Sequence, residues 1–347
     1  MDSLTQAVLG AAVQGAGMGK YQGRRALAYG AMLGTLPDLD VLIRYSDPVS
    51  SMTYHRGFSH SVFVLAALAA LIAWAVKKRY PDAPYSQSRL FWTTAAALIT
   101  HPLIDACTVY GTQLLWPFAP VPQQWSAVFI IDPLYTVPML LALVAVLWRG
   151  ITRRTHAALL ATLAFSTAYL VWGAYGQWHH ERRVAEHLRA QGVTVTHIMA
   201  TPLPLNTLTF RVVAQSDHGD YIEAISGWRD HAAPEYIRLP QGLAWAEPLR
   251  NDPLYQRLQW FTDGWLRVDE EGGKLVVSDL RMGISGALTF RFVMAERDGG
   301  AWQAVVPYRY GEQIPDIAPL LERLWPRIWR GEPLPLSEWA KITAALP

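Results

Sequence analysis

The sequence predicts an α+β protein: a polytopic bundle of about six transmembrane helices over residues 1–178, then a small, soluble, antiparallel β-rich domain over residues 179–347. Composition supports the first part, because 51% of the residues are hydrophobic and 17% are charged, against about 25% charged residues in an average soluble protein. Acidic residues are few up to about Tyr175, whereas Asp, Glu and Arg are spread through the chain after His179. This change indicates two domains.

Six apolar runs predict the helices of the first domain. They are Leu4 to Met18, Ala26 to Ile43, Ser61 to Val76, Leu90 to Ala106, Pro133 to Trp148 and Ala157 to Tyr175. Most are shorter than the roughly 20 residues that a straight membrane span needs, so a soluble helical bundle is the alternative. The third and fifth runs contain no charged residue and are apolar on all sides, which favours the membrane because a surface helix would show a polar stripe.

Basic residues predict the orientation of this bundle. They gather in the loops after the first, third and fifth helices: Lys20, Arg24 and Arg25; Lys77, Lys78 and Arg79; Arg149, Arg153 and Arg154. The positive-inside rule places these loops in the cytoplasm. We therefore expect a multi-pass protein of the inner (plasma) membrane, with the C-terminal domain on the external, periplasmic side. No Lys or Arg precedes Lys20, so the basic start of a signal peptide is lacking and the first helix is expected to be retained.

The second half has the patterns of an antiparallel β domain. Leu208 to Gln215 and Tyr221 to Trp228 flank a polar turn at residues 216–220, which predicts a hairpin. Further strands are expected over Lys274 to Ile284, Ala287 to Ala295 and Trp302 to Tyr310, and helices over Pro315 to Trp329 and Leu336 to Leu346. The first of these helices is rich in Trp, so it packs into the β domain or lies against the membrane surface.

Charge and cysteine content exclude some classes of function. A net charge of +2 without a basic stripe excludes nucleic acid as a partner. Because Cys107 is the single cysteine, a metal site here must use His, Asp and water.

Three short strings bring potential metal ligands into the apolar half: Pro37 to Asp40, His55 to His60 and His101 to Asp105. Charged groups near a bilayer centre cost roughly 2.5 to 3.5 kcal/mol each, so they persist when paired, hydrated or bound to a cation. Counting spans from the basic loops places all three strings on the external side. Coordination of one or two divalent metals would satisfy most of these groups at once.

Each string also has a simpler interpretation. His101 and Asp105 are four residues apart, which places both on one helix face, but such pairs often only share a hydrogen bond. Asp38 and Asp40 could bind one ion or bridge two, although Asp-x-Asp is commonly a turn or a cap. His55 and His60 enclose a turn in which Ser59 is expected to cap the next helix, with His60 in its first turn.

Other polar residues have weaker claims. Arg56 could hold an anionic oxygen or be a solvated surface cation. Asp132 precedes Pro133 as an N-cap residue would, and it could also orient a water or complete the coordination. Gln6 is expected to be a hydrogen-bonding neighbour of the site, and His179 and His180 are expected to lie in a solvated segment after the last helix.

At these residues the chain resembles the YdjM family of membrane-bound proteins, described as metal-dependent hydrolases. The resemblance rests on residues 1–6, Pro37 to Asp40, His55 to Ser61, His101 to Asp105, Tyr110 to Gln113, Trp116 to Phe118 and Ile131 to Tyr135, and less specifically on Pro202 to Asn206. Many members of that family carry His at the position of Gln6. A more distant likeness is to zinc-dependent phospholipase C, which also binds metals through His and Asp on helices. That likeness implies phosphoester hydrolysis.

We therefore expect a membrane-bound hydrolase with zinc, or alternatively manganese, held by Asp38, Asp40, His55, His60, His101 and Asp105. Such an ion lowers the pKa of a bound water towards about 7. Arg56 and Asp132 are expected to assist the reaction, and the substrate is expected to be an ester or phosphoester of an amphipathic membrane lipid. The rival is a non-enzymatic protein with a structural or sensed metal and a partner-binding β domain. A metal or proton pathway would need more ionisable residues on the cytoplasmic side than the helices supply.

Overall fold

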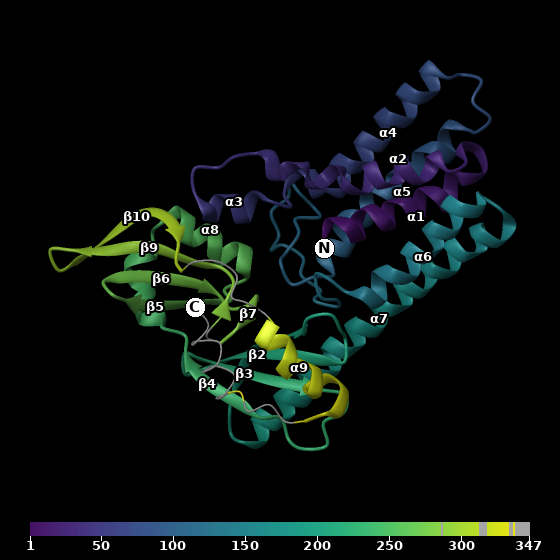
Figure 1. Ribbon diagram of the computed structural model, residues 1–347. Helices are drawn as coiled ribbons and strands as arrows, with labels where there is room; N and C mark the ends of the chain where they lie inside the picture. Colours follow the sequence, from purple (N-terminus) through teal and green to yellow (C-terminus); the bar gives the residue numbers. More distant parts are fainter. Residues whose placement is uncertain (286, 312–317, 333–335, 337–347) are drawn as a thin grey trace. The chain divides into compact units, whose positions relative to one another are not determined.

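The computed structural model describes residues 1–285, 287–311, 318–332 and 336 (Figure 1). It confirms the α+β class, because helices fill the first half and antiparallel sheets the second. The chain divides into two compact units. The first contains Met1–Arg44, His55–Ala174 and Pro204–Asn206, and the second contains Tyr45–Tyr54, Tyr175–Leu203 and Thr207–Pro347.

Each of the six apolar runs forms helix. The elements are α1 (Ser3–Gln22), α2 (Arg25–Thr35), the 3-10 helices η1 (Leu36–Leu42) and η2 (Phe58–His60), α4 (Val62–Arg79), α5 (Gln87–Ala106), α6 (Pro133–Arg149) and α7 (Arg153–Ala190). The second predicted helix is not continuous, since α2 ends at Thr35 and η1 follows. Pro37 explains the change, because it lacks a backbone N–H and so cannot donate the next hydrogen bond of an α-helix.

Close packing of α1 on α2 is allowed by glycine. A Cβ on Gly10 would overlap the carbonyl oxygen of Gly30, and a Cβ on Gly34 would overlap the carbonyl oxygen of Gln6. Small residues let two helix backbones approach in this way. The approach fixes the Gly34 carbonyl group next to the end of α2, where it reaches the site described below.

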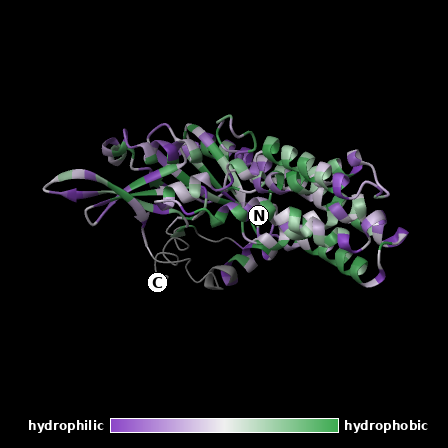
Figure 2. Ribbon diagram, turned by 90° about the horizontal axis from the view of Figure 1, so that it is seen from above, coloured by the Kyte–Doolittle hydropathy of each residue, from purple (hydrophilic) through white to green (hydrophobic). Residues whose placement is uncertain are grey.

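Fewer of the described helices are long and apolar enough to span a membrane than the sequence predicted. Among the described residues, α7 alone is long and apolar enough to cross a membrane, and the bent pair Pro48–His60 and Val62–Arg79 would add a second span. α6 is apolar but shorter. Figure 2 shows hydrophobic residues along the helices of the first unit, yet α1 and α5 interrupt theirs with Gly, Gln and Thr. The six-span bundle stays a prediction.

The second unit contains two four-stranded antiparallel sheets, ordered β1-β2-β3-β4 and β10-β9-β6-β5, and a two-stranded sheet of β7 and β8. The strands are β1 (Val195–Pro202), β2 (Thr209–Ser216), β3 (Asp220–Gly227), β4 (Tyr236–Pro240), β5 (Leu266–Glu271), β6 (Lys274–Asp279), β7 (Gly283–Ile284), β8 (Ala287–Leu288), β9 (Arg291–Asp298) and β10 (Ala301–Arg309). The predicted hairpin is β2 paired with β3. Two predicted strands each divide in two, Lys274 to Ile284 into β6 and β7, and Ala287 to Ala295 into β8 and β9.

Helices of the second unit are α3 (Pro48–Tyr54), η3 (Leu243–Leu249), α8 (Pro253–Thr262), α9 (Ala318–Arg330) and the end of α7. In α9, Leu324 and Ile328 are buried in a core cluster, whereas Trp325 and Trp329 are exposed. Packing into the β domain is therefore confirmed for one face of the predicted Trp-rich helix. The helix expected over Leu336 to Leu346 lies, from residue 337 onward, outside the described residues.

α7 continues well past the point where hydrophobicity ends. The division between the two units falls within it, between Ala174 and Tyr175. The expectation that His180 is solvated is wrong: its side chain is buried, its Nδ1 lies 2.8 Å from Ser226 Oγ, and its ring stacks on Phe210. The helix persists because Ala, Glu, Arg and His, which fill its last turns, are acceptable helix residues whatever their polarity.

Candidate metal centre

His101 and Asp105 lie on one face of α5, one turn apart, as their spacing predicted. Asp105 Oδ2 is 3.4 Å from Nε2 of His101, and the two side chains expose at most 1% of their surface. α5 therefore presents an imidazole and a carboxylate together inside the first unit.

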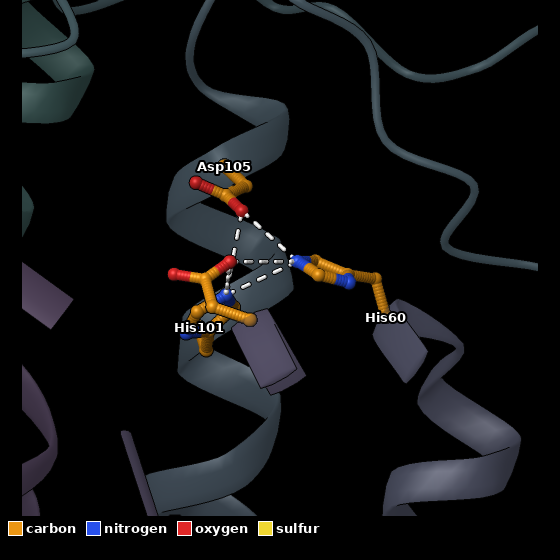
Figure 3. A group of neighbouring side chains, drawn as sticks. His60, His101 and Asp105 are labelled. Atoms are coloured by element: carbon orange, nitrogen blue, oxygen red, sulfur yellow. Dashed lines mark hydrogen bonds and ion pairs between the residues drawn. The ribbon is translucent and has the colours of Figure 1, made fainter. Parts of the chain in front are cut away.

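A neighbouring carbonyl group determines which ring nitrogen of His101 carries the hydrogen. Nδ1 of His101 lies 2.5 Å from the carbonyl oxygen of Gly34. A carbonyl oxygen only accepts hydrogen bonds, so Nδ1 donates. The lone pair of the neutral imidazole is then on Nε2, which points towards His60 and Asp105 (Figure 3). Metal-binding histidines are commonly oriented by such a bond through the other ring nitrogen.

His60 is oriented in the same way by a hydroxyl group. Ser59 Oγ donates to Asp40 Oδ2 at 2.7 Å and lies 2.9 Å from Nδ1 of His60. Because the single hydroxyl hydrogen goes to the carboxylate, the hydroxyl oxygen accepts from Nδ1, and the lone pair of His60 is also on Nε2. The prediction that Ser59 caps the next helix is wrong, since Ser61 caps α4 by accepting from the backbone N–H of Phe63.

The two Nε2 atoms face each other at 3.1 Å. Lone pairs at this distance repel unless a cation lies between them, either a proton or a metal ion. Asp38 Oδ1 is 3.6 Å from Nε2 of His60 and 3.3 Å from Nε2 of His101, and Asp105 Oδ2 is 3.3 Å from Nε2 of His60. Ligands of a tetrahedral zinc ion with bonds of about 2.0 to 2.1 Å are about 3.3 to 3.4 Å apart. This group of side chains could therefore hold a metal ion.

Asp105 provides a second indication. Its buried Oδ2 has no hydrogen-bond partner among the described residues. Its other oxygen, Oδ1, accepts from Gln6 Nε2 at 3.1 Å and pairs with the amino group of Met1. The charge of Arg56, whose Nε lies 3.2 Å from Oδ2, offsets part of the cost of burying this oxygen, and a cation among the four ligand atoms would give it a direct partner. Gln6 is a hydrogen-bonding neighbour of the site, as expected.

Arg56 is buried beside this cluster, which excludes the alternative of a solvated surface cation. Its Nε lies 3.2 Å from Asp105 Oδ2, its Nη1 donates to Thr108 Oγ1 at 3.3 Å, and its guanidinium lies over the ring of Tyr110. The backbone of Arg56 has a φ of 60°, an unusual value for a residue other than glycine that is often found at functional sites. Arg56 thus supplies positive charge to the anionic side chains.

Asp38, Asp40 and His55 form a second group that could hold an ion, and Asp38 belongs to both groups. Nδ1 of His55 lies 2.9 Å from Asp40 Oδ1, while Asp40 Oδ2 accepts from the backbone N–H of Arg56 at 3.0 Å. The Ser59 hydroxyl also donates to Asp40 Oδ2 at 2.7 Å. These contacts hold the Asp40 carboxylate in position beside Asp38 and His55.

Asp132 has other partners. Its Oδ1 accepts from the backbone N–H groups of Leu134 and Tyr135 at 3.0 and 3.3 Å, and its Oδ2 accepts from the Tyr169 hydroxyl at 2.9 Å. These bonds make Asp132 the N-cap of α6. Within the described part of the chain, it joins neither group of potential ligands.

The sequence did not predict the roles of Gly34 and Ser59. Gly34 acts through its backbone carbonyl, which any residue possesses, and Ser59 acts through contacts with partners that converge only after folding. The one available signal is the spacing of Gly30 and Gly34, which is typical of closely packed helices.

The similarity to known proteins lies in the helical half of the chain, which also contains the candidate metal ligands. The model of the YdjM inner membrane protein family matches residues 1–180, so the predicted family resemblance is confirmed. The uncharacterized protein YfhP of Bacillus subtilis (strain 168) is 30% identical over 139 residues, which are 38% of this chain and 41% of that protein. The chain thus matches less than half the length of this relative. No solved structure matches the chain.

Proposed function

The chain belongs to the YdjM inner membrane protein family, and we propose that it is a membrane-bound, metal-dependent hydrolase acting on an ester or phosphoester of an amphipathic, lipid-like substrate. The observation that carries the proposal is the approach of two imidazole lone pairs to 3.1 Å between two carboxylates. Family membership indicates an inner membrane location, which brings lipid headgroups within reach.

Zinc is the proposed ion, with manganese as the alternative. Imidazole nitrogens and carboxylate oxygens at tetrahedral spacing suit zinc. When bound, the ion would act as a Lewis acid and lower the pKa of water towards neutrality. The chain itself contributes orientation: the Gly34 carbonyl fixes the ring of His101, and the link from Asp40 through Ser59 fixes the ring of His60.

Substrate is proposed to approach from the side of Asp38. This side chain is 22% exposed and His55 is 23% exposed, whereas His60 and His101 are fully buried. The group of Asp38, Asp40 and His55 has three potential ligands, and three protein ligands leave a position for water or substrate. We therefore assign the reaction to this group and structural support to the buried group, with Asp38 shared between them.

Arg56 is proposed to balance the negative charge of Asp105, and its expected contact with a substrate phosphate stays a prediction. A phosphate oxygen would have to compete for Arg56 with Asp105 and Thr108. Asp132 is proposed to act as a helix cap that holds the start of α6, and its expected action on a water also stays a prediction.

The site is proposed to face the external side of the membrane, because Lys and Arg are concentrated in the loops at residues 20–25, 77–79 and 149–154. A cysteine introduced near Lys78 should then resist a membrane-impermeant thiol reagent in intact cells, and one near Asp217 should react. The opposite labelling pattern would place the site on the cytoplasmic side.

A second function has one observation in its favour. Asp38, His60, His101 and Asp105 supply four ligands, and a closed four-ligand shell is typical of a structural ion. In that case the metal would be structural or sensed, and the β domain would bind a partner. The presence or absence of hydrolysis separates the two functions.

The test uses the purified full chain. Elemental analysis should find bound metal, and a panel of phospholipids and phosphodiesters should include a substrate whose hydrolysis stops with a chelator and returns with zinc or manganese. His218→Ala is the control, because His218 is 77% exposed in the second unit. If metal-replete protein hydrolyses nothing and its metal shell is closed, the structural or sensing function replaces the enzyme.

A further inference from the structure

The connection between α5 and α6 has an unusual composition. Between Asp105 and Asp132 the chain contains no Asp, Glu, Lys or Arg, although most of this segment is neither helix nor strand. Connections that face water are normally polar, because their backbone and side chains are solvated. The composition indicates that this connection faces an apolar environment.

Backbone hydrogen bonds fix this connection against the segment that carries His60. The backbone N–H of Gln113 donates to the carbonyl oxygen of Arg56 at 3.0 Å, and that of Val62 donates to the carbonyl oxygen of Leu114 at 2.9 Å. The hydroxyl of Ser61 donates to the carbonyl oxygen of Trp116 at 2.6 Å. Residues 113–116 therefore keep a fixed position relative to the candidate metal ligands.

Four exposed aromatic side chains, which we call the aromatic patch, lie on these two segments. Phe58, Phe63, Trp116 and Phe118 are 45%, 50%, 40% and 67% exposed. The rings of Phe58 and Trp116 are 6.3 Å apart and those of Phe63 and Phe118 are 5.9 Å apart, both edge to face. Phe58 and His60 lie in the same 3-10 helix, η2, so the chain links the patch directly to the candidate metal ligands.

We propose that the aromatic patch binds the hydrocarbon chain of a membrane lipid whose polar end lies at Asp38. Three observations support this occupant: membership in an inner membrane family, an uncharged connection carrying Trp and Phe, and hydrogen bonds that join it to the ligand segments. At a membrane interface Trp lies at the level of the headgroups, and Trp and Phe both contact the first part of the acyl chains. The inference rests on the proposed function in one respect, namely that the ester or phosphoester bond of the bound lipid lies at the candidate metal centre.

An aromatic residue that only anchors the protein in the membrane would not need to lie close to the candidate metal ligands. Trp92 is also exposed, but it lies nine residues before His101 along α5, which is about 13 Å at a rise of 1.5 Å per residue. It can contact lipid without contacting a lipid whose headgroup is at the metal centre. Trp92→Ala is therefore the control for effects of lipid contact alone.

The experiment measures binding without turnover. The probes are phosphatidylglycerol with 16-carbon chains and phosphatidylglycerol with 4-carbon chains, added to the metal-loaded, detergent-solubilised full chain. Phe58→Ala combined with Trp116→Ala should weaken binding of the long-chain probe by about tenfold or more, since apolar contact area is lost. Binding of the short-chain probe and metal content should stay unchanged, and Trp92→Ala should match the wild type for both probes.

Three outcomes would overturn the inference: unchanged long-chain affinity in the double variant, an equal loss for both probes, or a shift from dimer to monomer as its main effect, which would assign the patch to a second copy. Retained metal shows that the variant is folded around the site. If the wild type binds the long-chain probe through the patch but hydrolyses no lipid, the inference stands and the proposed hydrolase fails.

Discussion

The two units bury charged side chains in different ways. In the second unit, Glu223 accepts from Arg211 Nη2 at 2.9 Å and from the Ser285 hydroxyl at 2.5 Å, and Asp279 accepts from Arg281 Nε and Nη2 at 2.9 and 2.7 Å. Each of these carboxylates thus accepts hydrogen bonds from a buried arginine of the same unit. In the first unit, Asp105 Oδ2 and the Nε2 atoms of His60 and His101 lie 3.1 to 3.4 Å from one another, with Arg56 Nε 3.2 Å from that oxygen, and a cation among them would bind all three.

The difference distinguishes structural charges from a binding site. Buried ion pairs satisfy each other, and removal of one partner leaves an uncompensated charge. The His and Asp cluster is satisfied when a cation is added. Burial alone is the same in both units, so the arrangement of donors and acceptors carries the information about function.

The largest effects are expected from two substitutions, one that removes a candidate metal ligand in the first unit and one that removes a partner of a buried ion pair in the second. His101→Ala should abolish binding of the ion held by Asp38, His60, His101 and Asp105, because it removes a ligand, and it should lower any hydrolysis, because the shared Asp38 loses its support. Asp279→Ala should lower the free energy of unfolding by about 3 to 5 kcal/mol, since Arg281 stays buried without its partner, while folded protein keeps its metal. Elemental analysis of both folded variants, with thermal unfolding of each, checks the comparison. Equal metal content in wild type and His101→Ala would contradict it.

Ser59→Ala should weaken metal binding without removing a ligand. Loss of the hydroxyl breaks the link between Asp40 and His60, and changes of this kind typically lower metal affinity by about 10- to 100-fold. Competition with a chromophoric zinc chelator measures the affinity. Ser51→Ala is the control, because its hydroxyl donates to the backbone carbonyl of Asp47, just before α3. Wild-type affinity in Ser59→Ala would show that the hydroxyl does not orient the imidazole.

The smallest expected effect is a pH dependence confined to the second unit. Burial opposes ionisation of Glu223, but the guanidinium of Arg211 holds its pKa below the usual 4.5. The folded state thus binds the proton less well than the unfolded state. This contribution to stability is present above about pH 4.5 and is lost as the pH falls through the folded pKa. Unfolding by urea across pH 3 to 7 should show this loss in the wild type and a flatter profile in Glu223→Gln. Identical slopes would exclude Glu223 as the cause.

The sequence predicted those parts of the fold and site that depend on local patterns. Apolar runs predicted the six helices of the first half, and the spacing of His101 and Asp105 predicted a shared helix face. The turn at residues 216–220 predicted the hairpin of β2 and β3. Each of these features depends on residues that are neighbours in the sequence.

Features that depend on distant contacts were not predicted. Pairing of the Gly34 carbonyl with His101 depends on the packing of α2 beside α5, and Ser59 acquires its role from Asp40 across a loop. η1 replaces the end of a predicted helix because the effect of Pro37 outweighs the apolar pattern. α7 continues to Ala190 because helix propensity does not follow hydrophobicity.

X-ray absorption spectroscopy of the purified, zinc-loaded full chain can show whether Asp38, His60, His101 and Asp105 bind a metal ion. We expect one tightly bound ion for this group, with nitrogen and oxygen ligands at about 2.0 to 2.2 Å and imidazole scattering that disappears in His101→Ala. Zinc that washes out of the wild type, or a spectrum unchanged by His101→Ala, would contradict it.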